Sequence, residues 1–366
     1  MEQTKTRQSN FELLRIIAMI MIVFFHFAMH SGFNFDTNSI TITRLWIQFI
    51  LMGGKIGVNL FVLISGYFLV GSSKFKISKV LKLWGQVFFY SVLIYGIFIA
   101  FGLETFNVKE LIKNILPITF EQWWFASSYF VLYLLSPFIN VFLTQLDRKT
   151  YKKMLMVMTI CWCIIPTFTT TDFQSNDLIW FFYLYSLAGY IKLYEKNFTS
   201  KNKIYFSFTF AFILLNFLIV ILFDLIGFKI GFFGKNATYF YNMKRLPTLL
   251  ISIFLFLGFK NTKMKYHKTI NLISSATFGV YLIHDNNLIR PFLWNNIFDG
   301  VALANTIALI PYSIVVVIII YLVCTIIELL RIHMLEIHFM KIVEKIVSKI
   351  NNVINKIMNL NFVKKL

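Results

Sequence analysis

The sequence predicts an all-α integral membrane protein with about ten transmembrane helices and both termini in the cytoplasm. Hydrophobic residues make up 58% of its 366 residues, whereas charged residues make up only 14%. The mean hydropathy of +0.71 is higher than the core of a soluble protein of this size requires. The apolar residues also form runs long enough to cross a bilayer, and most Lys and Arg residues lie between alternate runs.

These apolar runs give the candidate helices in order. Nothing resembling a signal-peptide cleavage site follows the first run, so we expect it to remain as the first helix. Three runs, 154–171, 178–194 and 246–259, are short for a bilayer crossing, and the helix count depends most on them. The candidate spans are residues 11–30, 45–70, 83–103, 123–143, 154–171, 178–194, 204–226, 246–259, 270–290 and 303–330.

The distribution of basic residues predicts the orientation. If the N-terminus is inside, most of the 35 Lys and Arg residues fall in inside segments, as the positive-inside rule requires. Both termini are therefore predicted to be cytoplasmic. The inside cations before the tail are Lys5, Arg7, Lys74, Lys76, Lys79, Lys82, Arg148, Lys149, Lys152, Lys153, Lys192, Lys196, Lys201, Lys203, Lys260, Lys263, Lys265 and Lys268.

The loop 227–245 breaks this rule, because it is predicted to be outside yet carries Lys229, Lys235, Lys244 and Arg245 and no acid. One explanation is a miscounted span nearby. The other is an outward basic and aromatic surface for an anionic or carbohydrate acceptor, since aromatic faces stack on sugars and cations attract acidic groups. On the second explanation, Lys244 and Arg245 are candidate substrate-binding residues.

The chain divides into a cytoplasmic N-terminus at residues 1–10, a transmembrane domain at 11–330 and a basic tail at 331–366. The tail repeats apolar residues at helical spacing from His333 onward with lysines on other faces, so it resembles an amphipathic helix lying on anionic lipids of the inner leaflet. This basic rim explains the net charge of +19 without a nucleic-acid partner. High usage of Lys, Ile, Asn and Phe suggests a bacterial plasma membrane.

The cysteines and histidines do not indicate a metal site. All 3 cysteines lie within apolar runs, and neither a disulfide framework nor a zinc knuckle is indicated. His26 and His30 share one helix face, but the sequence offers no identifiable third ligand. We therefore expect no metal and no bound cofactor.

Arg15 and His26 stand out because both lie within the first apolar run, where a charged side chain costs roughly 2.5–3.5 kcal/mol on insertion scales. Their spacing corresponds to about three full turns plus roughly 20°, so on a helix they share one face about 16 Å apart. With the N-terminus inside, Arg15 lies near the inner end of its span and His26 near the outer end. The pair forms a polar line down a helix that crosses the membrane.

Four segments resemble, in order, motifs of the membrane-bound acyltransferase 3 family, which includes bacterial O-acetyltransferases of surface polysaccharides. The first is FELLRIIAMIMIVFFHF, which contains Arg15 and His26. The others are GKIGVNLFVLISGYFL (Gly54–Leu69), WWFASSYFVLYLLSPFIN (Trp123–Asn140) and SSATFGVYLIH (Ser274–His284). The resemblance covers roughly residues 11–330. One departure is Asn59, which stands where many members have an acid.

The resemblance implies ten helices, an acyl-CoA donor in the cytoplasm and an acceptor hydroxyl on the far side. Acyl transfer to a hydroxyl requires a base, and histidine titrates near the working pH. We therefore predict His26 as the general base. Arg15 is predicted as the donor-side cation, which holds a CoA phosphate or polarises the donor carbonyl.

Four further residues are candidates for binding substrate. Lys55, deep in the second run, either snorkels and pairs with another helix or binds donor phosphates or the acceptor. Trp124 belongs to an expected interfacial aromatic belt, yet with Glu121 it could form the floor of a sugar site. His284 falls within the last motif, and Asp285 follows it. Adjacent helical residues diverge by about 100°, so these two need not pair.

The sequence thus predicts an integral membrane O-acyltransferase that moves an acyl group, expected to be acetyl, from acetyl-CoA or another acyl-CoA to a hydroxyl of a cell-surface or lipid-linked glycan. Its expected partners are the acyl-CoA, the glycan, anionic lipids and polysaccharide-assembly proteins. A transporter or flippase for a lipid-linked sugar or small amphiphile is the main alternative, in which Arg15, Lys55 and His26 would line the path. Such transporters often contain paired repeats, which this chain does not obviously have.

Overall fold

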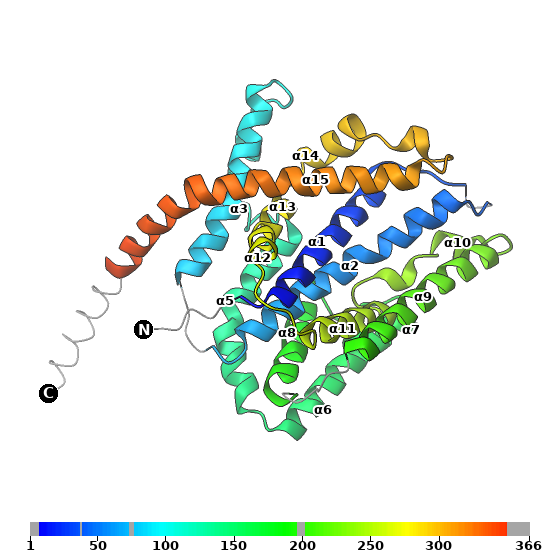
Figure 1. Cartoon of the computed structure of the whole chain (residues 1–366), viewed down its shortest axis with the longest axis horizontal. Coiled ribbons are helices and arrows are strands. Elements are labelled where there is room, and N and C mark those ends of the chain that lie inside the picture. Colours follow the sequence, from blue (N-terminus) through cyan, green and yellow to red (C-terminus); the bar gives the residue numbers. More distant parts are fainter. Residues whose placement is uncertain (1–6, 37–38, 73–76, 196–201, 350–366) are drawn as a thin grey trace.

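The computed structural model describes residues 7–36, 39–72, 77–195 and 202–349, and within these residues the fold is helical throughout, with no strand (Figure 1). It has 8 helices long and apolar enough to cross a membrane. This is the fold of a multi-pass membrane protein. The eight run over Ser9–His30, Ile42–Leu69, Ile77–Ala100, Trp124–Gln145, Arg148–Phe168, Asn202–Gly227, Gly231–Lys260 and Leu309–Lys349.

Two predicted spans are not among these eight. Helix α8 (Asp177–Tyr194) matches the run 178–194 but has only 18 residues and is buried on nearly every side, with Trp180 and Phe181 fully covered. The run 270–290 is broken at Ala276 into α12 (Lys268–Ser275) and α13 (Thr277–His284). Whether these segments cross the membrane, and which end of the molecule faces the cytoplasm, stay predictions.

Helices α1 (Ser9–His30) and α2 (Ile42–Leu69) lie side by side in the middle of the molecule (Figure 1). Their close contact depends on glycines of α2. A Cβ atom at Gly54 would lie 2.2 Å from the Phe25 ring, and one at Gly57 would lie 2.6 Å from the carbonyl oxygen of Ala18. Because no larger residue fits, the two backbones approach closely, which is how membrane helices commonly associate.

Buried polar contacts join α2 to the surrounding helices. The Asn59 amide donates to the Met243 carbonyl oxygen at 3.1 Å and accepts from the Trp180 indole at 2.9 Å. An ionised acid at this position could not donate to that carbonyl, whereas the amide donates and accepts at once. At the other end of α2, Arg44 forms a buried ion pair with Asp224 of α9.

The outer helices complete the molecule. Helix α9 (Asn202–Gly227) is the most exposed of the long helices. Only 22% of its most apolar 18-residue stretch is buried inside the protein. It packs along α11 (Leu246–Lys260), while α3 (Ile77–Ala100) and α5 (Trp124–Gln145) lie on the opposite side of the central pair (Figure 1). The remaining segments are α4 (Val108–Ile115), α6 (Arg148–Thr159), α7 (Ile165–Phe168), α10 (Gly231–Lys235) and α14 (Ile289–Pro291), 3-10 turns at Tyr239–Tyr241 and Val301–Leu303, and π-helical turns at Ile160–Ile164 and Phe292–Ile297.

The C-terminal helix continues past residue 331 without a break. Helix α15 (Leu309–Arg331) passes through a π-helical turn at Ile332–Glu336 into helix that reaches residue 349. In this part of the predicted tail the Phe339 ring lies against Gly85 of α3. Residues 350–366 of the tail lie outside the described residues, as do five predicted inside cations before it: Lys5, Lys74, Lys76, Lys196 and Lys201.

Candidate active site

A cavity of about 50 Å³ lies between the central helices and α5 and α13. His26 of α1, Lys55 of α2, Trp124 of α5 and Tyr281 of α13 are among its lining residues, and we call it the histidine cavity. Its volume is of the order of one or two water molecules. The close approach of α1 and α2 is what brings His26 and Lys55 to the same small space.

His26 is hydrogen-bonded to His284, so the fold joins two predicted site residues. Nδ1 of His26 lies 2.8 Å from Nε2 of His284, and both side chains are buried. Nδ1 of His284 lies 2.6 Å from the carbonyl oxygen of Val280, one turn earlier in α13. A carbonyl oxygen only accepts, so Nδ1 of His284 must carry a proton.

This arrangement determines the tautomer of His26 when both rings are neutral. If Nδ1 of His284 is protonated, its Nε2 is an acceptor, and Nδ1 of His26 must donate to it. The remaining ring nitrogen of His26, Nε2, then carries an available lone pair. The geometry therefore leaves one basic nitrogen on a buried histidine that lines a cavity.

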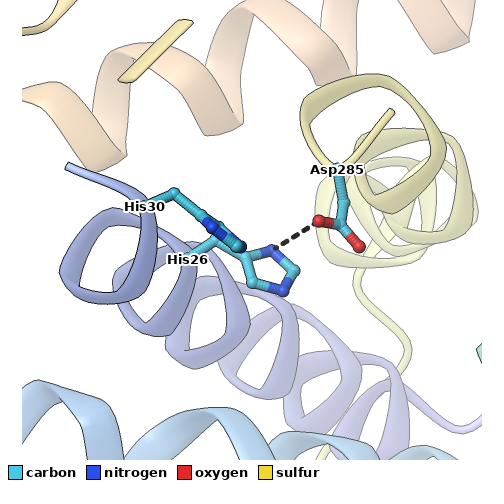
Figure 2. Close-up of side chains that lie close together, drawn as sticks. All are labelled: His26, His30 and Asp285. Carbon is cyan, nitrogen blue, oxygen red and sulfur yellow. Dashed lines mark ion pairs between the residues drawn. The ribbon is translucent and has the colours of Figure 1, made fainter. Parts of the chain in front are cut away.

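Asp285 and His30 complete a cluster around His26 (Figure 2). The carboxylate of Asp285, which caps the end of α13, lies 3.7 Å from Nδ1 of His26. Arg290 holds the same carboxylate oxygen through its Nε at 2.8 Å. The negative charge near Nδ1 would stabilise His26 once it has taken a proton.

The cluster could also be considered as a metal site. Ligand atoms of His26, His30 and Asp285 lie within 4.8 Å of one another. The Arg290 guanidinium already occupies one oxygen of Asp285, and a fixed positive charge there opposes binding of a cation. Proton chemistry fits the cluster better, and the absence of a metal stays a prediction.

Lys55 of α2 lines the histidine cavity together with aromatic rings. Its ammonium is 4.8 Å from the centroid of the Trp124 ring and 5.6 Å from that of Phe25. Cation–π contacts of this kind hold a charge in place while leaving its N–H groups able to donate. The structure thus brings together three predicted site residues, His26, Lys55 and Trp124, at one cavity.

Arg15 lines a second, larger cavity of about 410 Å³, which we call the arginine cavity. Three more cations line it: Arg7 before α1, and Lys79 and Lys82 on the first turns of α3. Arg15 also forms an ion pair with Glu12 at 2.6 Å. With four cations and one acid, the cavity favours an anionic ligand.

Besides His284, which contacts His26, three predicted site residues line neither cavity. Glu121 is exposed in the turn before α5. Lys244 and Arg245 are buried rather than displayed on an outward surface: the Lys244 ammonium donates to the Ser175 carbonyl at 2.5 Å, and both cations lie near the carboxylate of Asp172. Their roles in substrate binding stay predictions, although Arg245 does stack over the Tyr239 ring at 4.6 Å.

Sequence reasoning missed the pairing of His26 with His284 and the part played by Asp285 and Arg290. Asp285 comes after the last residue of α13, so the regular 100° divergence of neighbours does not apply to it. From the sequence, Lys79 and Lys82 serve only as positive charges that indicate the orientation of the protein in the membrane. Their spacing of three residues, which places them on one helix face, was the available signal.

A family model described as an acyltransferase domain matches residues 8–328, which include all four motif segments and every lining residue of the two cavities except Arg7. No curated protein and no solved structure matches the chain.

Proposed function

The chain belongs to the acyltransferase 3 family, and we propose that it moves an acetyl group from cytoplasmic acetyl-CoA to a hydroxyl of a cell-surface or lipid-linked glycan. Family membership and the multi-pass helical fold make the chain a membrane acyltransferase. The donor, the acceptor and the residue roles are the proposal. The observation that supports it best is the buried His26–His284 pair, which leaves Nε2 of His26 free to act as a base.

In the proposed reaction, Nε2 of His26 takes the proton of the acceptor hydroxyl as its oxygen attacks the thioester carbonyl. The new C–O bond forms, the C–S bond breaks, and the proton passes from His26 to the departing sulfur, which leaves as free CoA. The hydrogen bond to His284 keeps the proton on Nδ1 of His26. The carboxylate of Asp285, 3.7 Å from that nitrogen, stabilises the imidazolium that His26 forms during the reaction. Acyl-transfer enzymes commonly use a histidine base and a neighbouring acid that stabilises its protonated form, and the roles proposed for His26 and Asp285 are similar.

Lys55 is the group best placed to stabilise the negative charge that develops on the carbonyl oxygen. It lines the same cavity as His26, and its charge is held by aromatic rings, with no carboxylate of the described residues within ion-pair distance. A preorganised cation in a site with little water stabilises an oxyanion strongly. We therefore propose Lys55 as an electrophilic residue of the transfer step.

The arginine cavity is proposed to bind the anionic part of the donor. CoA carries several phosphate charges, and Arg7, Arg15, Lys79 and Lys82 supply the complementary positive charge. Arg15 lies about 16 Å along α1 from His26. The flexible arm of the donor would bridge that separation and carry the thioester to the base.

The experiment uses purified protein in lipid nanodiscs with acetyl-CoA labelled in the acetyl group. Candidate glycans with free hydroxyls are added one at a time, and free CoA and labelled glycan are measured together. The proposal predicts acceptor-dependent release of CoA with an equal amount of label on the glycan. Glycan transport without CoA release would instead favour the flippase alternative and would contradict the proposal.

A further inference from the structure

Three phenylalanines separate the two cavities. Phe61 of α2, Phe125 of α5 and Phe278 of α13 line both the histidine cavity and the arginine cavity. No other residue is shared between the two linings among the described residues. The wall between the cation-lined space and the base therefore consists of aromatic rings from three different helices.

Two rings of this wall are in contact, and Tyr281 connects the third ring to them. The centroids of Phe61 and Phe125 are 6.3 Å apart in an edge-to-face arrangement. Tyr281 continues the series, at 5.8 Å from Phe125 and 6.2 Å from Phe278. Contacts of this kind fill space without a hydrogen bond that would have to break when a ring turns.

The three rings differ in how firmly they are held. Phe125 is 8% exposed, stacks on Tyr129 and also contacts Phe181. Phe61 and Phe278 are only partly buried. Phe125 is thus the most enclosed of the three rings, and any opening of the wall would involve Phe61 or Phe278, which are more exposed.

We propose that Phe61, Phe125 and Phe278 form a gate between the donor-binding cavity and the base, and that this gate limits the size of the acyl group that reaches His26. The inference rests on the proposed function, because the thioester must pass these rings if its phosphates stay near Arg15. A closed wall also keeps water of the arginine cavity away from Nε2 of His26, where the base would otherwise promote hydrolysis of the thioester. The small histidine cavity beyond it admits an acetyl-sized group more readily than a long chain.

Thiol labelling tests the gate without relying on catalysis. In a background with the 3 native cysteines replaced by alanine, one variant carries Val58→Cys, which lines only the histidine cavity, and another carries Ser275→Cys, which lines only the arginine cavity. Both are treated with a small charged methanethiosulfonate in inside-out and in right-side-out vesicles. The side on which Ser275→Cys reacts identifies the entrance to the arginine cavity.

From that side, Val58→Cys is expected to react slowly when the three phenylalanines are present. Adding Phe278→Ala should raise its rate at least about tenfold, which corresponds to about 1.4 kcal/mol of barrier. Adding Phe138→Ala, on the same helix as Phe125 but 73% exposed and outside both cavities, should leave the rate unchanged. If the Phe278→Ala variant does not insert into the membrane, Phe278→Leu, which keeps more of the apolar volume, replaces it in the labelling test.

Equal rates for Val58→Cys with and without Phe278 would overturn the gate, as would fast labelling of Val58→Cys when all three rings are intact. Neither result depends on acetyl transfer, so failure of the gate can be told from failure of the proposed function. In active protein, Phe278→Ala should also increase CoA release without acceptor and the use of acyl-CoA donors longer than acetyl. No increase in either quantity would contradict the size-limiting role.

Discussion

At the scale of single residues, the site depends on which nitrogen of His26 carries the proton. His284 determines this through one hydrogen bond to His26 and one to the Val280 carbonyl oxygen. His284 is therefore a positioning residue in our account, since it acts on the substrate only through His26. A neutral imidazole with the wrong tautomer would present a donor where a base is needed.

Replacing His284 tests this positioning role. We expect His284→Ala to lower kcat about 10–100-fold with little change in KM, a range typical of residues that orient a reactive group. His284→Gln retains an acceptor for Nδ1 of His26 and should recover part of that loss. Steady-state assays of acetyl transfer measure both. Equal losses in the two variants would indicate that His284 serves only packing.

Lys55 provides a second test at the residue scale. Lys55→Met keeps most of the side-chain volume but removes the charge beside Trp124. Loss of a preorganised group that stabilises the oxyanion should lower kcat by about 10²–10³-fold. If KM for acetyl-CoA rises instead and kcat is unchanged, Lys55 binds the donor and does not act in the transfer step.

The sequence was informative about residues that are unusual for their surroundings. Arg15, His26 and Lys55 are ionisable groups within apolar runs, and each lines a cavity. Asp285 and Arg290 were not assigned roles because they lie past a helix end, where helical geometry no longer predicts direction. The burial of Lys244 and Arg245 depends on Asp172, which is distant in sequence.

At the scale of helices, the contact of α1 with α2 positions the site. Both His26 and Lys55 reach the histidine cavity only because Gly54 and Gly57 let the backbones approach. Small residues have this role in membrane helices because lipid offers no hydrophobic force that would press larger surfaces together. The motif around Gly54 is in this sense structural, even though it neighbours a proposed catalytic lysine.

Gly54→Val should therefore separate α1 from α2. The added Cβ would meet the Phe25 ring at 2.2 Å, so we expect a lower Tm in detergent and loss of acetyl transfer. Gly96→Ala in α3 is the matched control, since its Cβ would meet nothing within 4 Å. That control should be neutral or stabilising by up to about 1 kcal/mol. Equal Tm values for Gly54→Val and wild type would contradict the packing role.

The sequence predicted the boundaries of the short helix α11 well and the interruption of a longer run poorly. The run 246–259 corresponds closely to α11 at Leu246–Lys260, because a Pro near its start and Lys at its end mark the boundaries. The run 270–290 gave no indication of a break at Ala276, since apolar residues continue on both sides of it. Phe278, two residues after this break, lines both cavities.

At the scale of the whole molecule, the two cavities lie at different levels along α1. Residues from segments predicted to be cytoplasmic, including Arg7, Lys79 and Lys82, gather at the cavity that holds Arg15. The base lies farther along the same helix, beyond the phenylalanines. This arrangement suits a donor that is made on one side of the membrane and an acceptor that is presented from the other.

Removing a cation from the arginine cavity should weaken donor binding alone. Lys79→Gln is the cleanest change, because Lys82 also pairs with Glu336 of the C-terminal helix. We expect KM for acetyl-CoA to rise about 3–10-fold with kcat retained, and the increase to shrink at high salt, which screens such charges. The control is Lys149→Gln, because Lys149 is an exposed residue of α6 that lines neither cavity. Unchanged KM in Lys79→Gln would argue against donor phosphates in this cavity.

If Nε2 of His26 is the general base for acyl transfer, removing the imidazole must remove most of the acetyl transfer. Wild type and His26→Ala, inserted at equal levels in nanodiscs, are assayed for acceptor-dependent release of CoA from labelled acetyl-CoA. We expect the rate of acceptor-dependent CoA release to fall by about 10²–10⁴-fold in His26→Ala, which is the usual contribution of a positioned base. Acetyl transfer by His26→Ala at the wild-type rate would contradict it.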